Sequence, residues 1–110
     1  MATQLVAGKV KAGLDVVSEC AQTCEACALR CMNDSSMLDC ARTCLDCAVV
    51  CQALVTLLAR ESRFYRAFCR LCADICEACA NECAKFDVDH CRVCAETRRR
   101  CTTECRRLAA

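Results

Sequence analysis

The chain has 110 residues, of which 56% are hydrophobic and 26% are charged, and its formal net charge is +1. This length suits one domain with one core, the hydrophobic content excludes a disordered chain, and the small net charge disfavours a nucleic-acid partner. The chain has no proline, two glycines and 17 cysteines. Without proline or frequent glycine, helices are the expected structure.

The cysteines fall into four clusters, and the steps within each cluster alternate between three and four residues, with one missed position in the last. A mean step of about 3.5 residues is the period of one helix face in a bundle, so each cluster predicts one helix with a sulfur stripe. In chain order we expect helices over 4–32, 37–59, 62–84 and 88–108, in a single domain of residues 1–110. Because the connections are short, the expected fold is all-α: an antiparallel up-down-up-down four-helix bundle with a cysteine-lined core.

The three breaks between these helices carry unequal signals. The first contains the polar run Asn33–Ser36, where Ser36 and Asp39 resemble a capping box. Asp87 is a candidate cap for the last helix. The break at 60–62 has the weakest signal, since it contains neither glycine nor proline.

Alignment of the four stripes arranges the sulfur atoms in layers along the bundle axis. The first and third breaks lie at the same end of an up-down-up-down bundle, and the layers are counted from there. They are Cys31, Cys40, Cys83 and Cys91; Cys27, Cys44, Cys79 and Cys94; Cys24, Cys47 and Cys76; Cys20, Cys51, Cys72 and Cys101; and Cys69 with Cys105.

The third layer lacks a fourth cysteine, because Thr97 and Arg98 occupy that place. We expect Arg98 to extend its charged end toward solvent while Thr97 turns inward. Apolar residues are expected to complete the fifth layer and to close the end of the bundle beyond it: Val17, Leu54, Val10, Leu58, Phe64, Tyr65, Phe68 and Leu108.

Charge indicates which metal such a core would hold. A protonated cysteine is a small hydrophobe, so packing alone is an alternative, although thiols fill a core less well than leucine. Cu(I) replaces a thiol proton one for one, whereas a Zn²⁺ ion with four thiolates leaves a buried net negative charge. Thiolate also selects Cu(I), and sulfurs three or four residues apart on a helix can clasp one ion. The sequence therefore predicts multiple Cu(I) ions, at about one per cysteine.

The end of the bundle with the first layer carries two other soft ligands. His90 precedes Cys91, and Met37 lies three residues before Cys40. Imidazole and thioether both bind Cu(I), so we interpret His90 and Met37 as an uptake site that passes copper inward. The alternative is a surface histidine and a core methionine.

Three other functions remain as alternatives. A zinc or cadmium sequestration protein would load about one ion per four thiols. A disulfide-linked helical hairpin protein would have few free thiols, and a redox enzyme would need an exposed cysteine of low pKa. No nucleophile and base pair is visible, so we do not expect an enzyme, and a helical cysteine stripe suits an iron–sulfur cluster poorly.

The remaining features of the chain concern location and partners. Residues 1–15 lack a basic segment followed by an apolar run, so we expect a cytoplasmic location, where thiols stay reduced. No stretch approaches about 18 uncharged apolar residues, so we expect no membrane partner. The arginines of 88–108 are interpreted as a solvated face paired with acidic residues, without a nucleic-acid partner.

The spacing of these cysteines resembles that of the bacterial copper storage proteins, over about residues 17–108. The resemblance implies a four-helix bundle, often a homotetramer, that holds Cu(I) between thiolates, in the leaderless cytosolic branch with a histidine at the open end, here His90. Apart from the resemblance, we expect a copper chaperone or a small thiol as the copper donor. The departure at Thr97 and Arg98 implies fewer ions in the third layer. The stripes that carry the resemblance are Cys20-x3-Cys24-x2-Cys27-x3-Cys31, Cys40-x3-Cys44-x2-Cys47-x3-Cys51, Cys69-x2-Cys72-x3-Cys76-x2-Cys79-x3-Cys83, and Cys91 through Cys105.

Overall fold

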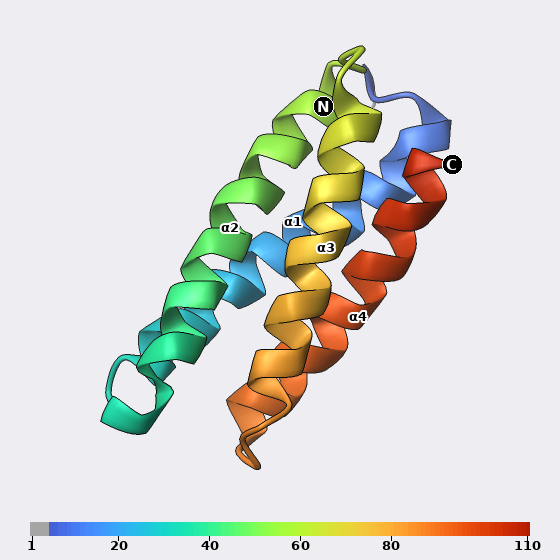
Figure 1. Ribbon diagram of the computed structural model, residues 1–110. Coiled ribbons are helices and arrows are strands. Elements are labelled where there is room, and N and C mark those ends of the chain that lie inside the picture. The colour runs from blue at the N-terminus through green and yellow to red at the C-terminus, as the bar shows by residue number, and fades with distance from the viewer. Residues whose placement is uncertain (1–4) are drawn as a thin grey trace.

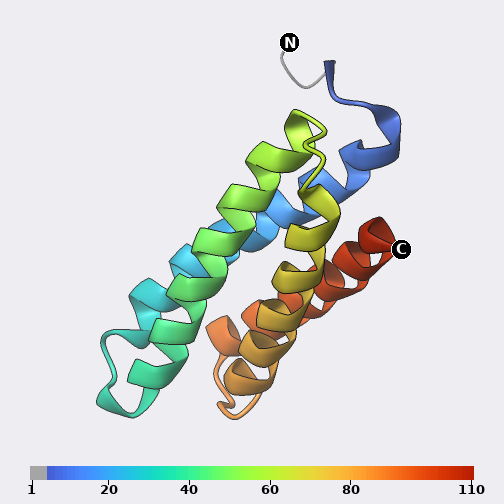
Figure 2. The same ribbon diagram turned by 45° about the horizontal axis from the view of Figure 1, so that its top comes forward.

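The computed structural model describes residues 5–110 and forms an all-α four-helix bundle (Figure 1). Helix α1 packs against α2 and α4, and α3 packs against the same two helices. The α1–α2 and α3–α4 connections lie at one end of the bundle in both views (Figures 1 and 2), which confirms the predicted up-down-up-down order. The elements are α1 (Gly8–Cys31), the short 3-10 helix η2 (Ser35–Met37), α2 (Leu38–Ala59), α3 (Tyr65–Cys83) and α4 (Asp89–Ala109).

Two of the expected helix starts are too early. The first helix was expected from residue 4, which lies outside the described residues, and residues 5–7 precede the helix that begins at Gly8. The third helix was expected from residue 62 but begins at Tyr65. The remaining bounds agree with the prediction to within about two residues, the usual uncertainty at frayed helix ends.

The break between α2 and α3 is a helix stop built without glycine. The N–H of Ser62 donates to the carbonyl of Leu57 at 2.9 Å, and the N–H of Glu61 donates to that of Leu58 at 3.1 Å. This pattern is a Schellman motif, whose left-handed residue is usually glycine and is here Glu61, with φ 48°. The hydroxyl of Ser62 then accepts the N–H of Phe64 at 3.1 Å, so the chain turns before α3 starts.

Both predicted side-chain caps are wrong. Asp34, rather than Ser36, caps the turn after α1. The Asp34 carboxylate accepts hydrogen bonds from the backbone N–H of Ser36 at 2.9 Å and from the Ser36 hydroxyl at 2.7 Å. Asp39 instead pairs with Arg42. Helix α4 begins after Val88 without a side-chain cap, and Asp87 forms an ion pair with Arg92. Asp39 and Asp87 therefore pair with nearby arginines and cap neither helix.

Alanine makes room for the helices to approach one another around the cysteines. In seven places a buried alanine directly follows a buried cysteine, beginning with Cys20 and Ala21 in α1. A methyl group fills little space, so neighbouring helices pack closely beside the sulfur stripe. The buried alanines are Ala21, Ala28, Ala41, Ala48, Ala73, Ala80 and Ala95.

Larger hydrocarbon side chains fill the end of the bundle that holds the α2–α3 connection. We call this region the apolar plug; its buried members are Val10, Leu14, Val17, Leu54, Leu58, Tyr65 and Leu108. Gly13 lets Leu108 pack closely against α1, since a Cβ at Gly13 would lie 2.4 Å from Cδ1 of Leu108. Phe64 was expected in the plug but is 54% exposed, with the Arg63 guanidinium 4.8 Å from its ring centroid, and Phe68 is only partly buried.

One segment is apolar enough to cross a membrane by length and composition alone. An 18-residue window within Ser35–Ala59 reaches a mean hydropathy of 1.5. No membrane-spanning segment was expected from the sequence, because charged residues interrupt this one. Core helices of soluble proteins pass the same test, and the buried residues of α2 lie on its cysteine face within the bundle.

We expect the apolar plug to contribute a large share of the free energy of unfolding. Leu54 is fully buried, so Leu54→Ala should lower the free energy of unfolding of the reduced metal-free protein by about 2–5 kcal/mol through lost burial and a cavity. Leu71 is 46% exposed, so the control Leu71→Ala should change it by less than about 0.5 kcal/mol. Urea unfolding followed by circular dichroism measures both; equal losses would contradict the assignment of the plug.

Candidate metal centre

All 17 cysteines lie in the core as free thiols, and none is more than 2% exposed. The alternation of three and four residues keeps each stripe on the inward face of its helix, as predicted from the spacing. Helices α1, α2 and α4 each contribute four cysteines and α3 contributes five. The four stripes therefore enclose a continuous sulfur-lined interior.

Sulfur atoms from different helices face one another at close range. The sulfurs of Cys40 and Cys83 are 3.4 Å apart, as expected for the first layer. Pairs from the next three layers are slightly further apart, at 3.6–3.7 Å, and other contacts run diagonally, for example the 3.3 Å contact between Cys83 and Cys94. The layers are therefore staggered along the axis. The three matching pairs are Cys44 with Cys79 at 3.7 Å, Cys47 with Cys76 at 3.6 Å and Cys51 with Cys72 at 3.6 Å.

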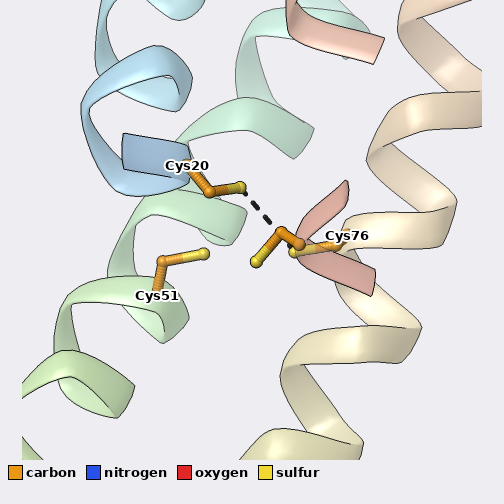
Figure 3. Close-up of side chains that lie close together, drawn as sticks. Cys20, Cys51 and Cys76 are labelled. Carbon is orange, nitrogen blue, oxygen red and sulfur yellow. Dashed lines mark hydrogen bonds between the residues drawn. The ribbon is translucent and has the colours of Figure 1, made fainter. Parts of the chain in front are cut away.

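Five groups of ligand atoms lie within 4.8 Å of one another among the described residues. Figure 3 shows three members of one group, Cys20, Cys51 and Cys76, whose sulfur atoms come from three helices and converge. The groups are Cys20, Cys51, Cys76 and Cys101; Cys20, Cys24, Cys47 and Cys51; Cys27, Cys40, Cys44 and Cys83; Cys27, Cys31, His90 and Cys91; and Cys72, Cys101 and Cys105.

These groups overlap, and the overlap restricts the chemistry they can perform. Cys20 and Cys51 each belong to two groups, and so do Cys27 and Cys101. Separate tetrahedral zinc sites would each need their own set of ligands. A sulfur that belongs to two groups can instead bridge two metal ions, so the geometry fits a soft, low-coordinate ion bound by shared thiolates.

His90 joins the sulfur cluster at the end of the first layer. Its Nε2 atom lies 3.6 Å from Sγ of Cys31, and the ring is partly buried. His90 and Cys27 both line a surface pocket of about 280 Å³, together with Arg30 and Val93. A solvent-accessible path therefore leads to a group that contains both an imidazole and thiols.

Met37 lies at the same end of the bundle but in a different environment. It ends the 3-10 helix η2, is 8% exposed and packs within the core. The structure thus places Met37 in the core at the His90 end, outside the five ligand groups.

Arg98 contradicts the expectation that it extends toward solvent. Its side chain is fully buried, and Thr97 is buried beside it. The Nε–H donates to Sγ of Cys79 at 2.7 Å, and Nη1 donates to the carbonyl of Cys94 at 3.2 Å, while Nη2 has no partner among the described residues. The guanidinium fills the space left by the missing fourth cysteine, and the backbone and sulfur acceptors there hold it inside.

The surroundings of Arg98 keep it charged. Burial lowers the pKa of its guanidinium, but the negative potential of the sulfurs of Cys24 and Cys79 more than offsets this and raises the pKa overall. The other arginines of α4 with ion-pair partners lie at the surface; Arg100, for example, is 3.3 Å from Glu19. Arg98 is therefore a buried cation among thiols, and its signal in the sequence was an arginine at the position where the stripe of the last helix misses a cysteine.

Burial also determines the protonation of the thiols at the His90 end. Desolvation, reinforced by the neighbouring Cys27 and Cys40, raises the pKa of Cys91 from its ordinary 9.0 to about 12. The same causes raise the pKa of Cys31. Without metal, these thiols stay protonated at neutral pH, and a bound cation must replace their protons.

The raised pKa of Cys91 predicts how stability depends on pH. Below about pH 9 the Cys91 thiol is protonated in both the folded and the unfolded state, and its contribution to stability is intact. Between pH 9 and 12 the thiol ionises in the unfolded chain but stays protonated in the folded one. The free energy of unfolding of the reduced metal-free protein should therefore fall as the pH rises through this range, and Cys91→Ala should make the decline shallower. Denaturant unfolding at a series of pH values tests this, and a flat profile would contradict it.

Comparison with known proteins agrees with this geometry. The family model described as copper storage protein matches residues 6–110. A Bacillus subtilis (strain 168) protein, the uncharacterized cysteine-rich protein YhjQ, is 37% identical over 83 residues, which cover 73% of this chain and 77% of that protein.

Solved structures are similar over almost the whole chain. The metal-free copper storage protein 3 of Bacillus subtilis is 37% identical, with a TM-score of 0.87 over 92% of this chain and 99% of its own, and its Cu(I)-bound form has a TM-score of 0.88. The Streptomyces lividans copper storage protein Ccsp, loaded with 10 copper equivalents, is 38% identical, with a TM-score of 0.84 over 91% of this chain and 83% of its own. The chain belongs to the copper storage protein family.

Proposed function

We propose that the 17 core cysteines of this copper storage protein hold Cu(I) as shared, bridging thiolates, at about one ion per cysteine. The observation that carries this proposal is the overlap of the ligand groups: Cys20, Cys51, Cys27 and Cys101 each belong to two of them. A thiolate that bridges two ions supplies half of the ligands of each, so two-coordinate ions and sulfurs occur in equal numbers.

The charge of the core supports Cu(I) as the stored ion. Each Cu(I) replaces one thiol proton, so filling the interior adds no net charge to a dry core. Divalent ions held by four thiolates would leave excess negative charge at every site. The store acts by binding and release, without chemical turnover.

Copper would enter at the His90 end. The pocket beside His90 reaches Cys27, a member of two ligand groups, while the apolar plug closes the opposite end. Met37, buried at the same end, is proposed as a further thioether ligand. A copper chaperone or a small thiol could deliver its ion at this pocket by thiolate exchange.

A cytoplasmic location and self-association complete the proposal. The Streptomyces relative is described as a cytosolic copper storage protein, and a reducing compartment keeps thiols free. Between α1 and α2, the exposed side chains of Leu29, Met32 and Leu45 and the partly buried Val55 line a pocket of about 780 Å³. Such a surface supports a homo-oligomer, and a tetramer is the form we propose.

A copper titration tests the storage function. Reduced protein titrated anaerobically with Cu(I) against a competing chelator should bind copper to a plateau well above about ten ions per chain, with helicity unchanged. A parallel Zn²⁺ titration is the control and should stop near one ion per four thiols. A copper plateau of about four or fewer would reject storage in favour of zinc sequestration or disulfides.

His90→Ala tests the uptake end. Removal of the imidazole should slow copper uptake by about threefold or more while leaving the plateau almost unchanged, because His90 belongs to one ligand group only, that of Cys27, Cys31 and Cys91. Stopped-flow transfer from a coloured Cu(I) chelate measures the rate. Val93→Ala, in the same pocket, is the matched control and should leave the rate unaltered. An unaltered rate in His90→Ala would remove His90 from the mechanism.

A further inference from the structure

The sulfur atoms form two networks along the bundle axis. The His90-end network contains Cys27, Cys31, Cys40, Cys44, Cys79, Cys83, Cys91 and Cys94. The plug-end network contains Cys20, Cys24, Cys47, Cys51, Cys72, Cys76, Cys101 and Cys105, with Cys69 adjoining through Cys105. Among the described residues, no ligand group spans the two networks, and the sulfur contact between them is that of Cys79 with Cys47.

Arg98 lies at the boundary between these networks. On α4 the preceding cysteine, Cys94, belongs to the His90-end network and the next, Cys101, to the plug-end network, two helical turns and about 10 Å further along. Each of the other three helices crosses the boundary with cysteines only three residues apart. The interruption in α4 is filled by the fully buried guanidinium.

The guanidinium also occupies the sulfur through which copper would cross. Cys79 and Cys47 face each other across the boundary, and Cys79 is the sulfur that accepts the Nε–H of Arg98 at 2.7 Å. That hydrogen bond uses electron density that Cys79 would offer to a second copper ion. A guanidinium carries five N–H donors and no acceptor, so it cannot serve as a ligand in place of the missing thiolate.

We propose that Arg98 divides the thiol core into two copper compartments and makes Cu(I) transfer from the His90-end network to the plug-end network the slow step of loading. The inference rests on the proposed Cu(I) storage. A Cu(I) ion moves along a series of thiolates when it binds the next sulfur before it releases the previous one. At the boundary the bridging sulfur of α4 is absent and a fixed positive charge stands beside the path, so this one step has a higher barrier than the others.

Uptake kinetics test the division directly. Reduced metal-free protein is mixed anaerobically with excess Cu(I) held by a coloured chelator, and the loss of the chelate is followed to its plateau. The native chain should load in two phases with similar amplitudes, the second slower by about tenfold or more. Arg98→Cys supplies the missing ligand and frees Cys79, so its two phases should differ by less than about twofold.

Two further variants separate the role of Arg98 from general effects. Arg98→Leu frees Cys79 without adding a ligand and should speed the slow phase by about threefold or more, so the test does not depend on the cysteine variant alone. Arg99→Cys adds a thiol at an exposed neighbouring position and should leave the slow phase unchanged.

The plateau and the phases report on different proposals. A plateau of about four ions or fewer in the native chain would reject storage, and the division with it. A full plateau reached in one phase would reject the division alone. Two phases that persist unchanged in both Arg98 variants would show that the boundary has another cause, and would overturn the role of Arg98.

Discussion

The charge that a dry interior can hold is the constraint on which this bundle depends. Seventeen thiols share one core, and burial raises the pKa of Cys31 and Cys91 at the His90 end, so these two thiols are protonated in the metal-free protein. A cargo that replaces one proton with one positive charge leaves this balance unchanged at any degree of filling. Arg98 is the one arginine that the structure buries completely, and sulfurs provide both its hydrogen-bond partner and its compensating potential.

The same core must also keep four helices together with side chains that bury little hydrocarbon. Alanine beside cysteine brings the helices close enough for sulfurs of different helices to meet at 3.3–3.9 Å. The apolar plug supplies the larger side chains, such as Leu54 and Leu58, that a sulfur-lined core lacks. Different parts of the bundle therefore supply stability and bind metal. The apolar plug closes one end, and the pocket at His90 opens the other to solvent.

Most of the fold and the cysteine positions could be predicted because they depend on local periodicity. A step of three or four residues determines which side chains share a helix face, whatever that face packs against. The inward placement of all 17 cysteines and the four helices followed from this rule. Helix ends depend on competition among nearby polar groups, so Asp34 rather than Ser36 caps the first turn, and Glu61 ends α2 in a conformation that is usually adopted by glycine.

The sequence by itself determined the fold class, the sulfur-lined interior and its suitability for a monovalent soft ion. Only the tertiary structure decided how the sulfurs are staggered, which of them belong to two ligand groups, and where Arg98 and Phe64 lie. Arg98 was expected at the surface and is buried, whereas Phe64 was expected in the core and is exposed. The reason is physical: whether a side chain is buried depends on the volume and the hydrogen-bond acceptors that other helices place opposite it, and these come from residues far away in the chain.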